Sequence, residues 1–229
     1  MIPGNVFITG ATGYIGRVLI PRLLERGHEV RAVVRPGSER KLPPGCHTVI
    51  GNALDASSFA DQLAPSDTFV QLVGVPHPSP AKAAEFRSID FASVRASVSA
   101  AAGAGLKHFV YVSVAQPSPV MKDYQAVRAE GEKIIRDSGL AATILRPWYV
   151  LGPGHRWPYA LIPIYWLLER IPGTRETARR LGLVTLDQMV NALVASVEFK
   201  PDGVRIIEVP LIKTLTPGGD LINGVELGG

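Results

Sequence analysis

The sequence predicts an α/β fold built on a parallel sheet that is covered by helices on both faces. Short apolar runs, typical of buried strands, alternate along the chain with longer segments whose apolar residues recur at helical spacing. The first unit shows this order most clearly: an apolar run at residues 5–9, three glycines at three-residue intervals, and a helical pattern after Gly16. A strand, a glycine turn and a helix in that order indicate a doubly wound, Rossmann-type sheet.

The other elements continue the alternation in chain order. We expect further strands at residues 29–35, 46–50, 67–74, 108–113, 141–147 and 203–210. We expect helices over residues 81–102 and 121–137 and from Leu183 onward. No repeat or linker interrupts this pattern, which predicts a single domain.

Composition narrows the classes of protein to consider. Lysine and arginine number 24 against 20 acidic residues, and no block of like charges occurs, so we expect no nucleic-acid partner. The single cysteine, Cys46, excludes an internal disulfide and fits a reducing compartment. Residues 1–20 contain no leader, and no window reaches about 18 uncharged apolar residues, so we expect a cytoplasmic protein without an integral membrane segment. We expect no metal site.

The three glycines of the first unit have distinct physical roles. Gly10 lets the chain turn sharply, Gly13 has no side chain to keep a pyrophosphate away, and Gly16 lets the helix pack close to the strand. Phosphates would then lie on free N–H groups at a helix N-terminus, where the helix dipole favours negative charge. A tight turn without a ligand is the alternative. The pattern predicts cofactor contacts from Gly10, Thr12, Gly13, Tyr14, Ile15 and Gly16.

Two motifs resemble the short-chain dehydrogenase/reductase superfamily. Residues 9–16 have the form Thr-Gly-x-x-Gly-x-x-Gly, in a version similar to the extended and atypical branches. Leu-Arg-Pro at 145–147, followed by Gly-Pro-Gly at 152–154, is similar to the segment after the sixth strand in those branches. The resemblance covers roughly residues 5–210. It implies an NAD(P)H-binding protein like the NAD-dependent epimerases and dehydratases, in a superfamily that also holds reductases and inactive NADP-binding regulators.

The resemblance also bears on domain organisation. Extended members usually carry a larger C-terminal substrate lobe, whereas this chain leaves few residues after Arg146. We therefore expect one NAD(P)-binding Rossmann domain over residues 1–229 with a reduced C-terminal substrate lobe. Residues of about 147–182 would form an insertion on the substrate or partner side.

The ends of the later strands predict further cofactor contacts. In dinucleotide folds an acid after the second strand bonds the ribose of NAD, whereas an arginine accommodates the 2′-phosphate of NADP. Arg35 ends that strand here, so we expect NADP(H) to be favoured over NAD(H), with a solvated basic loop as the alternative. Asn52 stands where the superfamily often has an acid near the adenine. Together, the strand ends and the resemblance add Asn52, Ala53, Leu72, Val73, Gly74, Arg128 and Pro147.

The resemblance implies a catalytic tyrosine, a lysine four residues later, and a serine or threonine at the end of the preceding strand. This chain has Tyr124 and Arg128 at the first two places, one helical turn apart. Arginine is bulkier than lysine and differently shaped, so this change is not conservative. The third place falls on Ser113 or on Val114. We expect Tyr124, Arg128 and Ser113 to be catalytic; the alternative is that Tyr124 anchors the cofactor without proton transfer.

The substrate side combines aromatic and basic residues. The apolar run at residues 161–168 suits a substrate pocket, a homodimer or protein contact, a membrane surface or a plain buried helix. The arginines from 170 to 180 suit a solvated face or an anion site. The residues predicted to contact substrate are His77, Trp148, Tyr149, Arg156 and Trp157.

These features predict an NADP-dependent oxidoreductase of the atypical short-chain type, acting on a small carbonyl or alcohol substrate. A catalytically inactive NADP-binding sensor or assembly module is the first alternative, and the replacement of lysine by Arg128 favours it. A nucleotide-sugar epimerase or dehydratase-like enzyme is the second.

Overall fold

The structure is a computed structural model of the chain that describes residues 3–153, 166, 170–171 and 173–218. Within these residues, a central parallel sheet has the order β3–β2–β1–β4–β5–β6–β9. Its strands are β1 (Asn5–Thr9), β2 (Glu29–Val34), β3 (His47–Ile50), β4 (Thr68–Gln71), β5 (His108–Val112), β6 (Ala142–Arg146) and β9 (Val204–Glu208). The predicted doubly wound α/β fold is therefore confirmed, and each predicted strand is present to within a few residues.

Helices follow the strands as the sequence pattern predicts. The α-helices are α1 (Gly16–Glu25), α2 (Ala83–Glu85), α3 (Ala92–Gly103), α4 (Lys122–Asp137), α6 (Arg175–Arg180), α7 (Leu186–Glu198) and α8 (Val209–Ile212). Short helical turns are η1 (Glu39–Lys41), η2 (Ala56–Ser58), η3 (Ala60–Gln62), η4 (Pro80–Lys82) and the π-helical η5 (Phe86–Phe91). Thus the long helix expected over residues 81–102 is divided, because a π-helical segment separates α2 from α3.

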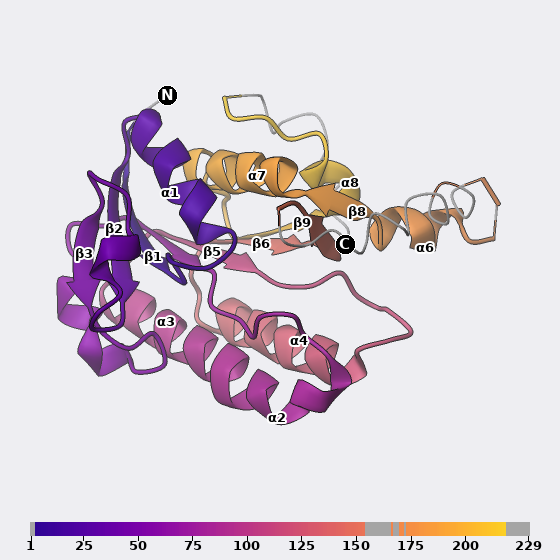
Figure 1. Cartoon of the computed structure of the whole chain (residues 1–229), viewed down its shortest axis with the longest axis horizontal. Helices are drawn as coiled ribbons and strands as arrows, with labels where there is room; N and C mark the ends of the chain where they lie inside the picture. Colours follow the sequence, from indigo (N-terminus) through magenta and orange to yellow (C-terminus); the bar gives the residue numbers. More distant parts are fainter. Residues whose placement is uncertain (1–2, 154–165, 167–169, 172, 219–229) are drawn as a thin grey trace.

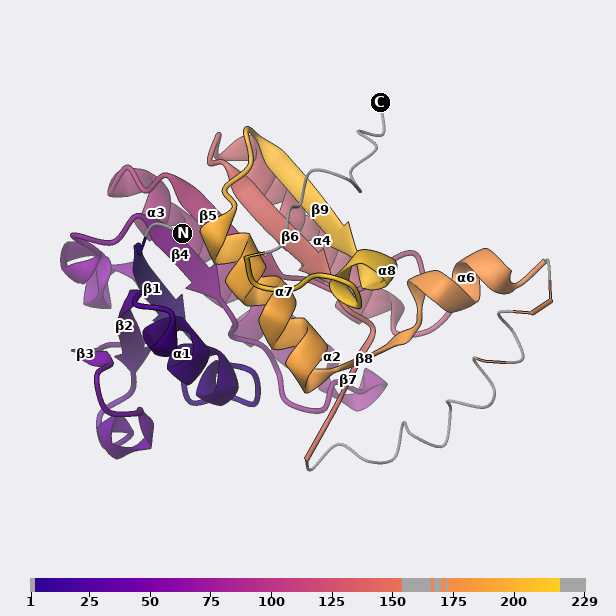
Figure 2. The ribbon, with the colours of Figure 1, turned by 90° about the horizontal axis from the view of Figure 1, so that it is seen from above.

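Two helical layers enclose the sheet. Figures 1 and 2 show α1 and α7 over one face and α2, α3 and α4 over the other. Each layer has its own core, and the second contains a row of rings in which Phe69 lies 5.3 Å from both Phe7 and Phe109. Because both faces are covered, β1 and β4 are buried at consecutive positions rather than at alternate ones, including the polar Thr68 and Gln71.

The direction of chain winding reverses beside β1. Val6 of β1 pairs with Val30 of β2 on one side and with Thr68 of β4 on the other. The chain first winds outward through β2 and β3, then crosses back to β4. In open α/β sheets a crevice at the carboxyl ends of the strands, at such a reversal, is the usual ligand site.

The chain after β6 contains structure that the sequence pattern did not predict. β7 (Tyr149–Leu151) and β8 (Leu183–Thr185) form a separate parallel pair, and α6 extends beyond the sheet (Figure 1). The helix that we expected from Leu183 onward begins at Leu186, because residues 183–185 form β8. Thr185 is the cap, because its side chain accepts the Gln188 N–H in a capping box, while Asp187 pairs with Arg22 at 2.8 Å.

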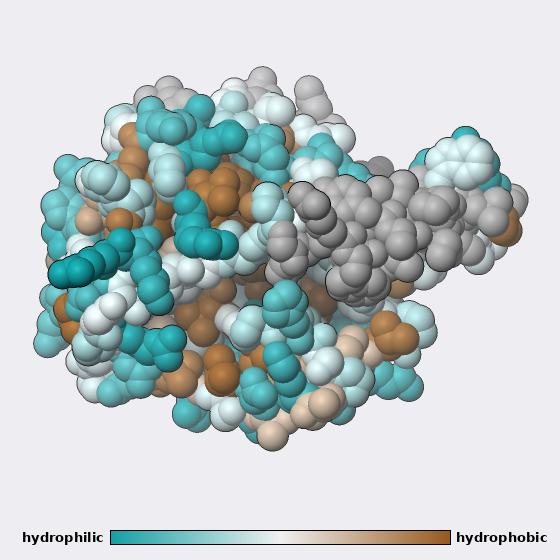
Figure 3. All heavy atoms as spheres, in the orientation of Figure 1, coloured by the Kyte–Doolittle hydropathy of each residue, from teal (hydrophilic) through white to brown (hydrophobic). Residues whose placement is uncertain are grey.

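The space-filling view shows hydrophobic side chains between the two helical layers and hydrophilic side chains over much of the surrounding surface (Figure 3). Within the described ranges, every helix is too short or too polar to cross a bilayer. The same residues hold no cluster of potential metal ligands.

Candidate functional site

The glycine loop between β1 and α1 has two glycines that packing requires. Gly10 has a φ of +78°, and a Cβ there would lie 2.7 Å from the carbonyl carbon of Leu72. A Cβ at Gly16 would lie 2.5 Å from the carbonyl oxygen of Ala11. Any side chain at either position would therefore collide with backbone and displace the loop.

Gly13 is different because it borders open space. A Cβ there would meet only the Gly10 carbonyl oxygen within 4 Å, at 3.1 Å. Among the described residues, no side chain caps the N-terminus of α1, and its first turn holds no acid. The positive end of the helix dipole is thus left to an outside anion.

A cavity of about 350 Å³ opens beside this loop, at the carboxyl ends of β1, β2, β3 and β4. It is formed by Gly10, Thr12, Gly13, Val33, Val34, Arg35, Ser38, Gly51, Asn52, Ala53, Leu54, Leu72, Val73, Gly74 and Ile89. Most of the predicted cofactor contacts therefore lie around one space. Tyr14, Ile15, Gly16, Arg128 and Pro147 are not among its lining residues. The open face of Gly13 and the uncapped helix fit a pyrophosphate group, so the residues present suit a dinucleotide.

Arg35 and Asn52 occupy two edges of this cavity. Arg35 directly follows β2, and its side chain is exposed. The Asn52 side-chain oxygen accepts the Leu54 N–H at 3.1 Å, and its backbone N–H donates to the Ser58 hydroxyl at 2.9 Å. Asn52 therefore holds its own turn while facing the cavity, and one lone pair of its amide oxygen is left for an adenine amino group.

Tyr14 and Pro147 lie at the junction between the loop and the chain after β6. A Cβ at Gly152 would lie only 2.2 Å from the Tyr14 hydroxyl oxygen, so the glycine loop touches the end of β7 through this side chain. Pro147 is buried, and its carbonyl accepts the Ala115 N–H at 2.9 Å. Neither residue lines the cavity.

Arg128 is held in a buried pair that the sequence analysis did not foresee. Its guanidinium contacts the Asp90 carboxylate at 2.5 Å, donates to the Tyr111 hydroxyl at 3.3 Å and donates to the Val112 carbonyl at 3.0 Å. Burial alone would lower the pKa of Arg128, but the Tyr124, Tyr111 and Asp90 side chains raise it, so the guanidinium stays charged. The same guanidinium lies 5.1 Å from the centre of the Tyr124 ring. Tyr124 and Arg128 are thus brought together, as their spacing predicts.

Ser113 belongs to a second buried network, centred on Glu132. Its hydroxyl donates to Glu132 at 2.7 Å, and Arg146 donates to both oxygens of the same carboxylate. Burial would raise the pKa of Glu132, but the hydrogen bonds from Arg146 and Ser113 outweigh it and lower the pKa. The Ser113 hydroxyl therefore already donates its hydrogen to Glu132.

Sequence reasoning missed Asp90 and Glu132, although both left a signal. Asp90 is an acid between Ile89 and Phe91 in a segment rich in alanine, where a charge needs a buried partner. Glu132 follows Arg128 by one helical turn and therefore shares its face of α4.

The predicted substrate residues do not form one group. The rings of Trp148 and Tyr149 meet edge to face with centres 5.4 Å apart, and burial raises the pKa of Tyr149. His77 is exposed in the loop after β4, with a φ of +50°, and is not part of the cavity. Arg156 and Trp157 lie outside the described residues, as do residues 161–165 of the apolar run.

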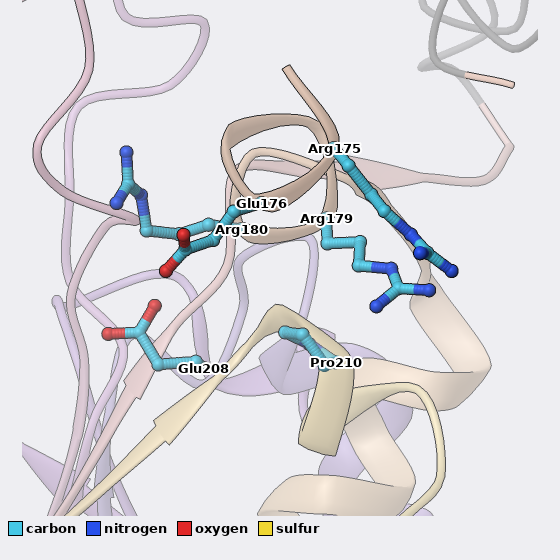
Figure 4. A pocket seen from close by; sticks show the side chains of 6 residues that line it. All are labelled: Arg175, Glu176, Arg179, Arg180, Glu208 and Pro210. Carbon is cyan, nitrogen blue, oxygen red and sulfur yellow. The ribbon is translucent and has the colours of Figure 1, made fainter. Parts of the chain in front are cut away.

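A second cavity, of about 440 Å³, lies between α6 and the end of β9 (Figure 4). Arg175 and Arg179 point to one side, whereas the carboxylates of Glu176 and Glu208 point toward one another. Arg180 also borders the cavity, and it donates to the Pro117 carbonyl at 3.2 Å. Its wall mixes both signs of charge, so the basic cluster is not a simple anion site.

Comparison with known proteins adds relatives of several activities. The chain is 28% identical to a ceramide reductase of Caulobacter vibrioides over 195 residues, which is 84% of this chain and 60% of that protein. It is 31% identical over 158 residues to the chloroplastic divinyl chlorophyllide a 8-vinyl-reductase of Oryza sativa subsp. indica, covering 62% of this chain and 39% of the relative. The chain therefore spans less than two thirds of either protein.

Solved structures share the fold at low sequence identity. The Bordetella bronchiseptica enzyme WbmH in complex with NAD+ is 21% identical, with a TM-score of 0.67 over 89% of this chain and 75% of that one. MoeE5 in complex with UDP-glucose and NAD is 22% identical, with a TM-score of 0.66 over 91% and 79%. A family model described as NAD(P)H-binding matches residues 10–156. The chain therefore belongs to this NAD(P)H-binding family.

Proposed function

We propose that the protein is an NADP(H)-dependent oxidoreductase of the atypical short-chain type that acts on a small carbonyl or alcohol substrate. The observation that carries the proposal is the cavity between the open face of Gly13 and the exposed Arg35. One end of this space offers an uncapped helix N-terminus for a pyrophosphate, and the other offers a guanidinium for a 2′-phosphate.

The other residues around the cavity suit particular parts of the cofactor. Asn52 and Ala53 would face the adenine, and Leu72 to Gly74 would flank the rest of the dinucleotide. When bound, a nicotinamide cofactor supplies or accepts a hydride. The protein's own task is then to orient the substrate and to exchange a proton with its oxygen.

Tyr124 is the proposed proton donor. Burial raises the pKa of its phenol, and the charge of Arg128 acts against this shift. A neutral phenol gives a proton to a carbonyl oxygen more readily than it removes one from an alcohol. The proposed direction is therefore carbonyl reduction, with Arg128 held beside the ring and Ser113 offering only lone pairs.

We further propose that residues of about 147–182 form the substrate or partner side of a single domain. β7, β8 and α6 follow the carboxyl end of β6 and lie apart from the central sheet (Figure 2). The reductase names of the two curated relatives support a reductase, but the chain spans only part of each.

A binding module without turnover is the second candidate. Two observations favour it: the Ser113 hydroxyl donates to Glu132, and the Arg128 guanidinium is engaged by Asp90. Such a protein would retain the nucleotide cavity and respond to the redox state of its cofactor.

Titration with NADPH and NADH, followed by cofactor fluorescence, tests the proposal. We expect tighter binding of NADPH, and consumption of NADPH with at least one member of a panel of small aldehydes and ketones. Tyr124→Phe should remove turnover and keep cofactor affinity. Binding without turnover across the panel would favour the module, and no binding of either cofactor would refute both candidates.

A further inference from the structure

Asp90 is an acidic residue in the interior of the protein, where side chains are usually apolar. It lies in the π-helical segment η5, a type of helix that often marks functional sites, and its side chain is fully buried. One oxygen accepts from Arg128 at 2.5 Å and the other accepts the Val75 N–H at 3.0 Å. Burial raises the pKa of the Asp90 carboxyl, and the Arg128 charge and the Val75 N–H act against this shift. Because both oxygens accept hydrogen bonds from fixed donors, one of them a guanidinium, the geometry favours the ionised carboxylate.

The guanidinium that Asp90 binds adjoins the cofactor cavity. A Cβ at Gly74 would lie 2.3 Å from the nearest nitrogen of Arg128, so the guanidinium fills the space beside this cavity residue. Arg128 is thus held between Asp90, the wall at Gly74 and the rings of Tyr111 and Tyr124.

A charge in that position has a predictable effect on Tyr124. An uncompensated cation about 4–6 Å from a titratable group lowers its pKa by about 1–3 units. Of the described titratable groups, Arg128 from its own helix and Asp90 from η5 act on the Tyr124 phenol, and Tyr124 in turn acts on Tyr111 from β5. Phe86, also from η5, covers the ring without charge, at 4.9 Å between centres. Asp90 is therefore the only anion in this set.

We infer that Asp90 is a positioning residue, which holds Arg128 in place and offsets most of its charge so that the Tyr124 hydroxyl stays protonated. This inference rests on the proposed function only for its consequence, namely that Tyr124 donates a proton rather than accepts one. The electrostatic arrangement itself needs neither cofactor nor substrate.

The test is a titration of the full chain, read from tyrosinate absorbance, with Tyr124→Phe in each background to identify the signal of Tyr124. In Asp90→Asn, which leaves Arg128 uncompensated, we expect the ionisation midpoint of Tyr124 to fall by about 1–3 pH units. Asp90→Glu should restore the wild-type midpoint. Coincident midpoints in Asp90→Asn and the wild type would overturn the inference.

A double variant keeps the inference testable if Asp90→Asn does not fold. Asp90→Asn/Arg128→Gln removes both charges and leaves no uncompensated ion in the interior. We expect its Tyr124 midpoint to match the wild type; a clearly higher midpoint would show that Arg128 acts uncancelled and would overturn the inference. A failure to bind NADPH would refute the proposed function without changing either titration.

Discussion

Two halves of the molecule differ in whether their polar groups have partners inside the protein: the half around β1, β2 and β3, and the half around β5, β6 and α4. In the first, which we call the open half, the glycine loop leaves a helix N-terminus uncapped and Arg35 exposed beside a cavity. In the second, which we call the closed half, the polar side chains are buried and have partners within the protein. Arg128 pairs with Asp90 and donates to the Val112 carbonyl, and Ser113 donates to Glu132. The open half is prepared for an outside ligand, whereas the closed half has satisfied its charges internally.

This difference between the halves means that charged groups contribute to ligand binding in one half and to stability in the other. In the open half, an unsatisfied helix end gains its partner only when an anion arrives, so its contribution is to binding. In the closed half, removing one partner leaves the other charge buried and uncompensated, so its contribution is to stability. Variants on the two sides should therefore affect different measurements.

The largest expected effect is in the closed half. Arg128→Ala should lower the free energy of unfolding by about 3–5 kcal/mol, because the buried Asp90 carboxylate loses its counter-charge. The matched control is Arg22→Ala, which removes the exposed pair with Asp187 and should cost less than about 1 kcal/mol. Denaturant unfolding measures both, and equal losses would contradict the distinction.

The next effect is in the open half. Gly13→Asp should weaken NADPH binding at least about 100-fold, or about 2.7 kcal/mol, because a carboxylate would face the pyrophosphate. Its unfolding free energy should change by no more than about 1 kcal/mol, since the position borders open space. Gly16→Ala is the control: its Cβ meets backbone at 2.5 Å, so stability should fall. Unchanged cofactor affinity in Gly13→Asp would refute the dinucleotide site.

A pH effect should distinguish the closed half further. His108 begins β5, with one ring nitrogen 3.0 Å from the Thr143 hydroxyl, and burial lowers its pKa to about 3. Below pH 6.5, His108 therefore binds a proton in the unfolded chain but not in the folded chain. The free energy of unfolding consequently falls as the pH decreases toward 3. Between pH 6.5 and 5 this loss is about 1.6 kcal/mol, because the slope reaches about 1.4 kcal/mol per pH unit only below the unfolded pKa.

The measurement is denaturant unfolding across that pH range, in the wild type and in His108→Gln. The variant lacks the imidazole and should lose stability less steeply on acidification, even if it is less stable at neutral pH. Identical slopes in the two proteins would contradict the assignment.

The smallest expected effect concerns cofactor choice. Arg35→Ser should weaken NADPH binding about tenfold, or about 1.4 kcal/mol, and leave NADH binding unchanged, because only NADPH carries the 2′-phosphate. Arg40→Ser changes a nearby exposed arginine in η1 that does not line the cavity, and it should alter neither affinity. Equal weakening of both cofactors by Arg35→Ser would remove the basis for NADP preference.

The sequence was more informative about the open half than about the closed half. The strand, the glycine turn and the helix are local in sequence, so their spacing predicts both the loop and its cavity. The partners of Arg128 and Ser113 are set by tertiary contacts: Asp90 comes from a different helical segment, and Glu132 meets Ser113 because α4 packs against the end of β5. β7 and β8 escaped prediction because each is only three residues long.

The contact between Tyr14 and Gly152 joins regions that lie far apart in the sequence. Because a Cβ at 152 would come within 2.2 Å of the tyrosine oxygen, a larger residue there requires a smaller one at position 14 or a shifted loop. We therefore expect substitutions at positions 14 and 152 to occur together. A change of substrate that began in the chain after β6 would be constrained, through this single hydroxyl, by the part of the molecule that holds the cofactor.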